Sequence, residues 1–290
     1  MPLIAHISDL HFSQIGLNPL QFFSKRWLGN ANLLLSRKKR FSEEILAPLP
    51  ALFEEKGVEW VTVTGDLTST GSSAELKKAK RFIQEVEQGR NVLIIPGNHD
   101  HYTKRDYRKK RFYQYFSNTR VYENRRLVND QFELGPLFEN WWYLCLETAI
   151  PTSLIYSTGL FSKHLEEKLI PVLKSFPKDQ KILMMNHFPF FQFDKPKNSL
   201  WRGEYLGKLL QETPQVQLYL HGHTHRHCIA DLRASHYPII LDSGCISFKE
   251  RASFNLLDLK DDSCALTVYR YQEDKWQPTE EKTFHFGKKA

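Results

Sequence analysis

The feature that most constrains the fold is a set of short apolar segments that each end directly in polar side chains. The segments LIAHI, WVTVT, VLIIP, KILMM and VQLYL are each followed by Asp, Asn or His residues. A short apolar run bounded by turn residues is typical of a buried strand. Helical patterns lie between several of these strands, so the chain is expected to be an α/β protein whose ligands bind beyond the carboxyl ends of the strands.

The expected elements extend this alternation along most of the chain. Strands are predicted at 3–8, 59–64 and 91–95, with a helix at 41–56 that prolines interrupt and a charged amphipathic helix at 72–88. Further strands are expected near 132 and at 141–146, 181–186 and 216–220, with helices at 162–175 and 203–212. From position 228 onward the pattern predicts consecutive short strands at 228–232, 237–242, 253–259 and 264–271.

The polar residues at the strand ends form motifs with the chemistry of metal ligands. They are Asp9-Leu10-His11, Gly65-Asp66, Gly97-Asn98-His99-Asp100, Asn186-His187 and Gly222-His223-Thr224-His225. Carboxylate and imidazole together suit divalent Mn, Fe, Zn, Ni or Co, and the absence of thiolate argues against a structural zinc site. Alternate residues of a strand share a side, so Asp9 is expected beside His11, and His223 beside His225. Asp66 could bridge two ions about 3.5–4 Å apart.

Taken in order, these motifs follow the pattern DxH…GD…GNH[DE]…H…GHxH. The chain therefore resembles the calcineurin-like metallophosphoesterase superfamily from residue 3 to about residue 259, and most resembles its small bacterial cyclic-nucleotide phosphodiesterases. The resemblance implies a four-layer α/β/β/α sandwich with two mixed β-sheets and a centre of two divalent ions, Mn, Fe or Zn. Without an internal repeat or a clear linker, a single domain over 1–290 is expected, with cap-like insertions at about 15–40 and 101–126.

The resemblance also implies a role for each matching residue. It assigns the first metal to Asp9, His11, Asp66 and His225, and the second metal to Asp66, Asn98, His187 and His223. His99 would face the substrate and protonate the leaving oxygen as a general acid, while Asp100 would orient the His99 ring and set its tautomer. His101 and His227 lie near these motifs in the sequence and are further candidates for substrate contact.

Composition bounds the setting of this chemistry. The chain has 290 residues, 41% of them hydrophobic, and a formal net charge of +7, which suits an anionic substrate or an anionic surface. Its four cysteines form no CxxC pair and are expected to be reduced. The start lacks the pattern of a signal peptide, and no apolar run reaches the roughly 18 residues of a membrane span. A cytoplasmic location is expected, with peripheral contact to the inner membrane left open.

Two basic and aromatic stretches keep several functions open. They are the run KRDYRKKR at 104–111 and the segment 22–40, which are either solvated protein surface or a cap that binds substrate or an anionic membrane. The first hypothesis is a metal-dependent phosphodiesterase that uses metal-activated water on a small phosphate ester, with nucleotides among the candidates. The alternative is a membrane-associated pyrophosphatase of the UDP-diacylglucosamine type, although one branch of those enzymes has Arg at the position of His99. A nuclease and a noncatalytic scaffold are less favoured, because no extra DNA-binding domain is evident and no motif residue is missing.

Overall fold

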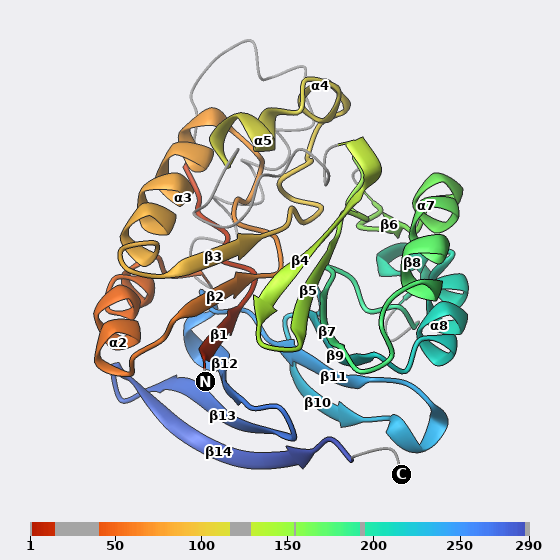
Figure 1. The fold of residues 1–290 in the computed structure, drawn as a ribbon. Coiled ribbons are helices and arrows are strands. Elements are labelled where there is room, and N and C mark those ends of the chain that lie inside the picture. Colours follow the sequence, from red (N-terminus) through yellow and green to blue (C-terminus); the bar gives the residue numbers. More distant parts are fainter. Residues whose placement is uncertain (1, 15–40, 117–128, 154, 192–194, 288–290) are drawn as a thin grey trace.

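In the computed structural model, two large β-sheets pack face to face, and helices cover the outer face of each sheet (Figure 1). The structure describes residues 2–14, 41–116, 129–153, 155–191 and 195–287. Each large sheet has six strands and contains both parallel and antiparallel pairs. The predicted four-layer sandwich with two mixed sheets is therefore confirmed.

The first sheet has the strand order β14-β13-β12-β1-β2-β3. Its parallel part is β1 (Leu3–Ile7), β2 (Trp60–Val63) and β3 (Asn91–Ile94), and its antiparallel part is β12 (Ser253–Leu259), β13 (Ser263–Gln272) and β14 (Lys275–His285). The predicted helix at 41–56 is divided into a 3-10 helix, Glu44–Leu46, and α2, Leu49–Glu55. Pro48 is the N-cap of α2, so this proline begins a helix.

The sequence of helix α3 (Ser73–Val86) explains where the helix starts and which of its faces is buried. Ser72 and Glu75 form a capping box, in which each side chain accepts a hydrogen bond from the backbone N–H of the other. The buried apolar side chains follow the helical repeat and are Leu76, Ala79, Phe82, Ile83 and Val86. The predicted helix at 72–88 is confirmed, and its buried face covers the first sheet beside α2 (Figure 1).

The second sheet has the strand order β10-β11-β9-β7-β5-β4. These strands are β4 (Phe132–Phe138), β5 (Trp141–Leu146), β7 (Lys181–Met185), β9 (Val216–His221), β10 (His227–Asp231) and β11 (Ile239–Ser243). Strand β7 is buried on both faces: Leu183 and Met185 join the core that includes the first sheet, while Ile182 and Met184 pack with the outer helices. Those helices are α7 (Lys163–Lys174) and α8 (Gly203–Glu212).

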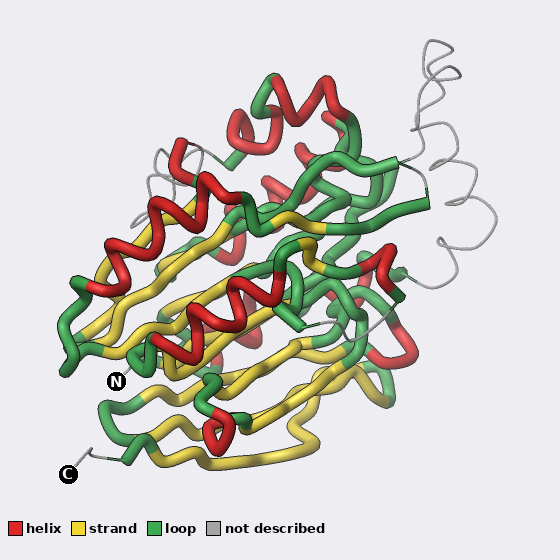
Figure 2. The backbone as a smooth tube through the Cα atoms, turned by 90° about the vertical axis from the view of Figure 1, so that its right-hand side faces the viewer, coloured by secondary structure: helices red, strands yellow, loops and turns green. Residues whose placement is uncertain are grey.

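The sandwich has a distinct end at which the functional loops gather. The N-terminus and the C-terminus lie at the opposite end, where β1 begins (Figure 2). The parallel strands β1, β2 and β3 therefore carry their carboxyl ends away from the termini. A short parallel pair is formed by β6 (Gly159–Leu160) and β8 (Leu200–Trp201). The 3-10 helix Pro196–Asn198 directly precedes β8 and contributes to the site described below.

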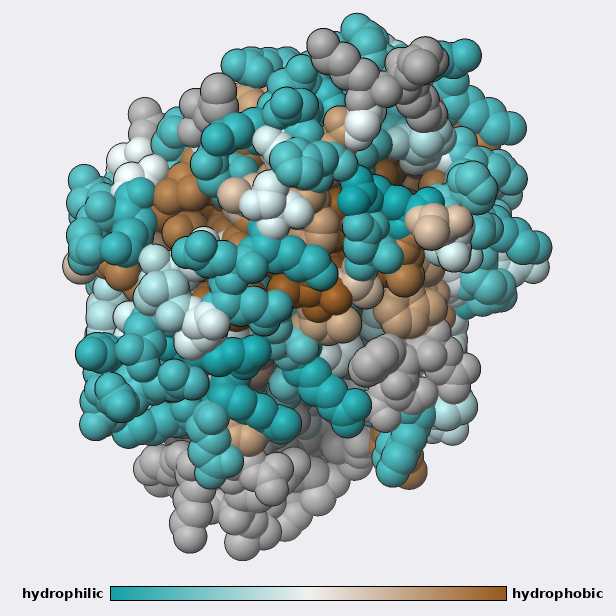
Figure 3. All heavy atoms as spheres, turned by 90° about the horizontal axis from the view of Figure 1, so that it is seen from below, coloured by the Kyte–Doolittle hydropathy of each residue, from teal (hydrophilic) through white to brown (hydrophobic). Residues whose placement is uncertain are grey.

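Strand β14 lies at the edge of the first sheet and is mostly exposed. Seen from below, the surface is mainly hydrophilic, with hydrophobic side chains between the polar ones (Figure 3). Lys275, Glu280, Glu281 and Lys282 lie along this edge, and Pro278 lies next to a register shift in the pairing with β13. Charged residues and proline are typical of an edge strand that is protected against pairing with another chain.

The described residues include only part of the predicted cap-like insertions. The insertion at 15–40 lies outside the described residues, as do positions 117–126 of the second insertion. The basic run at 104–111 falls on α4 (Lys104–Arg108) and at the start of α5 (Arg111–Tyr115), two short helices that follow the loop after β3. Within the described ranges, no helix combines the length and the apolar character needed to cross a membrane.

Candidate dinuclear metal centre

Two groups of side chains converge at the carboxyl ends of the strands, and Asp66 belongs to both. Ligand atoms of the first group, Asp9, His11, Asp66 and His225, lie within 4.8 Å of one another. The same holds for Asp66, His187 and His223, and Asn98 joins them because its Oδ1 is 3.2 Å from His187 Nε2. The structure thus brings together all seven candidate ligands, in the two sets that the resemblance implies.

Asp66 stands between the two sets as a bridging carboxylate would. Its Oδ2 lies 3.9 Å from Nε2 of His11 and 3.6 Å from Nε2 of His187. Its Oδ1 accepts a hydrogen bond of 2.8 Å from the backbone N–H of His99. Burial raises the pKa of Asp66, but the neighbouring histidines outweigh burial and hold the pKa far below its usual value. Asp66 is therefore ionised at neutral pH.

The first set leaves buried polar atoms that a cation would satisfy. The Nε2 atoms of His11 and His225 lie 3.0 Å apart, and His225 Nε2 is 3.1 Å from Asp9 Oδ1. Despite this closeness, Asp9 Oδ1 forms no hydrogen bond and is buried. A buried carboxylate oxygen without a donor is rare, and one beside two converging imidazole nitrogens fits a bound divalent metal.

Two histidines of the second set have their tautomers fixed by main-chain carbonyls. His187 Nδ1 lies 2.7 Å from the carbonyl oxygen of Thr64, and His223 Nε2 lies 2.9 Å from that of Asn198. Because a carbonyl only accepts hydrogen bonds, these nitrogens carry the protons. Nε2 of His187 and Nδ1 of His223 are left to bind metal, which is how outer partners commonly orient imidazole ligands.

Most of the candidate ligands have an unusual backbone conformation. Left-handed φ values occur at Asp9 (57°), His11 (50°), Asp66 (52°), His223 (70°) and His225 (55°). Asp9 and His11 lie beyond the end of β1, so the expected alternation along a strand is not what brings them together. Side chains other than glycine are strained in this region, although Asp, Asn and His tolerate it better than most. Such strain is typical of functional sites.

Two motif glycines permit the close approach of the loops. At Gly97 a Cβ atom would lie 2.8 Å from Asp66 Cγ and closer still to Asp66 Oδ1. At Gly222 a Cβ atom would lie 2.5 Å from Asp9 Oδ2 and 2.7 Å from Ser8 Cβ. Glycine at these positions therefore allows each carboxylate to reach the centre.

His99 lies beside the centre and is not part of either ligand group. Its Nδ1 is 2.7 Å from the carbonyl oxygen of Ser69, which therefore accepts a hydrogen bond from this nitrogen. The His99 ring meets the His11 ring edge to face, with centroids 5.1 Å apart. This hydrogen bond and the ring contact fix the orientation of the His99 side chain beside the centre.

The structure corrects the expected role of Asp100. Its carboxylate accepts four hydrogen bonds, from the backbone N–H groups of Gly97, Leu67 and Thr68 and from the hydroxyl of Thr68, at 2.8–3.2 Å. These donors occupy both oxygens, so the carbonyl of Ser69, rather than Asp100, holds the His99 ring. Burial and the charge of Asp66 raise the pKa of Asp100 to about 6. Asp100 joins the loops after β2 and β3 and is a positioning residue.

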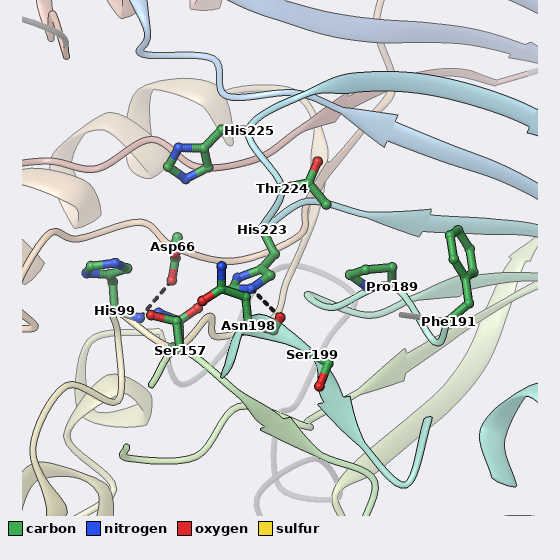
Figure 4. A pocket seen from close by; sticks show the side chains of 11 residues that line it. Asp66, His99, Ser157, Pro189, Phe191, Asn198, Ser199, His223, Thr224 and His225 are labelled. Atoms are coloured by element: carbon green, nitrogen blue, oxygen red, sulfur yellow. Dashed lines mark hydrogen bonds between the residues drawn. The ribbon is translucent and has the colours of Figure 1, made fainter. Parts of the chain in front are cut away.

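A cavity of about 140 Å³ opens over the centre. It extends from Asp66 and His99 at one end to Pro189 and Phe191 at the other (Figure 4). Its described lining residues are Asp66, Asn98, His99, Ser157, Pro189, Phe191, Asn198, Ser199, His223, Thr224 and His225. None of these is Lys or Arg, so the described walls offer an anion only imidazole, amide and hydroxyl groups apart from bound metal.

Other residues near the centre have structural partners. His101 is buried and its Nε2 lies 2.8 Å from Glu147 Oε1, while His227 Nε2 lies 2.9 Å from Asn255 Oδ1. Neither histidine lines the cavity, so the substrate contact considered for them is not supported. The thiol of Cys245, which no motif indicated, donates to the carbonyl of Asp9 at 3.0 Å. Burial raises the pKa of this thiol well above its ordinary value, so it remains protonated.

The sequence matches the family model described as calcineurin-like phosphoesterase over residues 2–227. The chain belongs to the calcineurin-like phosphoesterase family. A dimetal phosphatase from Danio rerio has a similar structure, with a TM-score of 0.66 and 15% identity over 99% of both chains. Purple acid phosphatase PPD1 from yellow lupin, Lupinus luteus, has a TM-score of 0.66 and 11% identity over 97% of this chain and 53% of its own. No curated protein matched the sequence.

This calcineurin-like phosphoesterase is accordingly a hydrolase of phosphoric esters that uses two divalent metal ions. Bound at such a site, two ions clamp the phosphate and lower the pKa of a bound water. The chain's own contribution is the carboxylate of Asp66 between the two sets, the fixed tautomers of His187 and His223, and the His99 ring held by the carbonyl of Ser69.

Proposed function

We propose that the chain is a metal-dependent phosphodiesterase that acts on a small phosphate ester, with Mn, Fe or Zn in its two sites. The metal ligands would be Asp9, His11, Asp66, Asn98, His187, His223 and His225, and His99 would be the general acid. A cytoplasmic enzyme built as a single domain over residues 1–290 is part of this proposal. The large core cluster supports the single domain, because it contains residues of both large sheets.

The observation that carries the diester preference is the absence of Lys and Arg from the described cavity lining. A phosphomonoester is largely a dianion at neutral pH and gains most from charge-assisted hydrogen bonds with Arg or Lys. A phosphodiester carries a single negative charge and two ester groups. The described walls lack Lys and Arg, and the cavity extends in two directions from the centre, toward His99 and toward Phe191. Both features suit a phosphodiester (Figure 4).

His99 would act on the leaving group at one end of the cavity. The Ser69 carbonyl accepts the hydrogen bond from Nδ1 and thereby orients the ring. A proton on Nε2 could then pass to the leaving oxygen, which a poor leaving group requires. Asp100 would contribute indirectly, because it holds together the loops that carry Asp66 and His99.

The proposal is tested by comparing bis(p-nitrophenyl) phosphate with p-nitrophenyl phosphate, in one buffer, with added Mn²⁺ and with chelator. We expect turnover that needs metal and favours the diester, and its loss in Asp66→Asn. A preference for the monoester would refute the substrate class while leaving the centre in place. Absence of both turnover and bound metal would refute the whole proposal.

A second candidate is a membrane-associated pyrophosphatase of the UDP-diacylglucosamine type. It is favoured by the exposure of Ile155 (70%) and Tyr156 (47%) next to Ser157, which lines the cavity. The backbone N–H of Ser157 bonds to the carbonyl of Lys197, so one basic residue adjoins this apolar pair. Such a mixture is typical of contact with an anionic bilayer. At low salt, the wild-type protein should sediment with anionic liposomes, and less of the Ile155→Asp protein should do so. Wild-type protein that stays in the supernatant would exclude this candidate.

A further inference from the structure

A second hollow of about 720 Å³ continues from the cavity, away from the metal ligands. The two share Phe191 and Ser199 in their linings, so a molecule held at the centre can extend from one into the other. The second hollow is named here the α8 groove. It is lined by Phe190, Phe191, Ser199, Leu200, Trp201, Arg202, Glu204, Gly207, Lys208, Gln211 and Tyr237.

Four of the residues that line the α8 groove are aromatic, namely Phe190, Phe191, Trp201 and Tyr237. Phe190 is 5% exposed and packs against Tyr237 in a tilted arrangement, with ring centroids 5.2 Å apart and an interplanar angle of 30°. Phe191 meets Phe190 edge to face at 5.0 Å. Trp201, on β8, is 49% exposed although it is a large apolar side chain. An incoming flat ring would therefore find several aromatic faces and edges, which favour stacked or edge-to-face contacts.

A glycine in the middle of α8 keeps this groove deep. Gly207 lies inside the helix, where glycine lowers stability relative to alanine. A Cβ at this position would lie 3.3 Å from the Phe190 ring and 3.8 Å from the Tyr237 ring. Any larger side chain would therefore project among the aromatic rings and fill the space between them.

The charged groups of the groove lie on the solvent side and partly compensate one another. Glu204, Lys208 and Gln211 are exposed on α8 and spaced so that they share one helix face. Arg202 pairs with Glu166, and its guanidinium lies 4.1 Å from the centroid of the Tyr205 ring. The groove therefore suits a neutral ring with polar edges better than a second phosphate group.

We propose that the α8 groove binds a planar aromatic ring of the nucleobase type, carried by the ester group that remains on phosphorus. The leaving group would lie toward His99 at the opposite end of the cavity (Figure 4). This inference rests on the proposed phosphodiesterase activity and names its substrate class, a linear nucleotidyl diester. A linear diester can span both the cavity and the groove, because its two ester groups point in different directions.

The test uses substrates with one leaving group and different retained groups. Thymidine 5′-(p-nitrophenyl phosphate) is compared with methyl p-nitrophenyl phosphate, and kcat/KM should favour the thymidine ester about tenfold, the effect of one stacked base. In Trp201→Ala this preference should fall severalfold. The matched control is Tyr156→Ala, which removes an aromatic ring of similar exposure that does not line the groove and should keep the preference.

A second variant and a second pair of substrates complete the test. Gly207→Leu introduces a residue of higher helix propensity than glycine and fills the groove, and it should reduce the preference for the thymidine ester as Trp201→Ala does. Benzyl p-nitrophenyl phosphate should have a higher kcat/KM than cyclohexylmethyl p-nitrophenyl phosphate. Equal values would refute a preference of the groove for aromatic rings. Equal kcat/KM for the thymidine and methyl esters would refute the proposal that the α8 groove binds the retained base. Hydrolysis of the monoester alone would instead overturn the phosphodiesterase proposal.

Discussion

Replacing Gly97 by alanine should disable the metal centre while leaving the fold intact. The new Cβ would lie 2.2 Å from Asp66 Oδ1 and 2.4 Å from the Asp66 backbone nitrogen, and ordinary van der Waals contact begins at 3.4 Å, so the loop that carries Asp66 must move by about 1 Å. Metal–ligand distances tolerate only about 0.2 Å. Overpacking of this kind costs roughly 1–3 kcal/mol of stability, which a domain of this size can withstand. Displacement of a shared ligand should weaken metal affinity by roughly 100-fold or more.

The assay is metal content after dialysis against a weak chelator, read together with thermal unfolding. Gly97→Ala should lose both metals because Asp66 belongs to both sets, yet it should still unfold cooperatively. Gly287→Ala is the matched control, since a Cβ there meets nothing within 4 Å. A folded Gly97→Ala protein that keeps two metals and wild-type turnover would show that this contact does not position Asp66.

Three further predictions address other parts of the molecule. His99→Ala should slow hydrolysis of a diester with an alkyl leaving group by about 10²–10⁴-fold and affect p-nitrophenyl esters far less, with both metals retained; an equal loss on both would contradict the role of His99. Burial and the charges of His221 and His227 lower the pKa of His6 to about 3, so between pH 6.5 and 3 the unfolded chain binds a proton that the folded chain does not. The free energy of unfolding should therefore rise with pH in this window, by up to about 1.4 kcal/mol per pH unit from this group, and His6→Gln should reduce the slope in urea titrations at pH 5 and 7. Glu147→Gln weakens the buried contacts with His101 and Tyr113 and should cost about 2 kcal/mol of stability without changing metal content, which calorimetry and metal analysis would check.

The sequence predicted the sheets and the strand-end motifs well because both depend on local patterns. A buried parallel strand is a short apolar run, and β2 and β3 stand out for this reason. Strand β14 was missed: Lys275–His285 is an exposed edge, so it lacks both an apolar run and regular alternation. Its pairing with β13 is set by the neighbouring strand, which the sequence of β14 alone does not contain.

The groups that orient the candidate ligands and His99 could not be predicted from the sequence either. The carbonyl oxygens of Thr64, Ser69 and Asn198 orient His187, His99 and His223, and a main-chain carbonyl gives no signal in a list of side chains. Asp100 was misjudged for a related reason. Its place in the GNHD motif suggested a partner for the adjacent histidine, whereas the folded loops present it with four donors from two segments.

The left-handed backbone of five candidate ligands has a consequence for how such a protein can change over generations. Glycine would adopt the φ values of Asp9, His11, Asp66, His223 and His225 without the penalty of roughly 1–2 kcal/mol that other residues incur. In a lineage that no longer needed catalysis, replacement by glycine would relieve strain at these sites, and selection for stability would favour it. Continued use of the centre is therefore what opposes the loss of these side chains, and efforts to raise thermostability by replacing left-handed residues with glycine must leave these five positions unchanged.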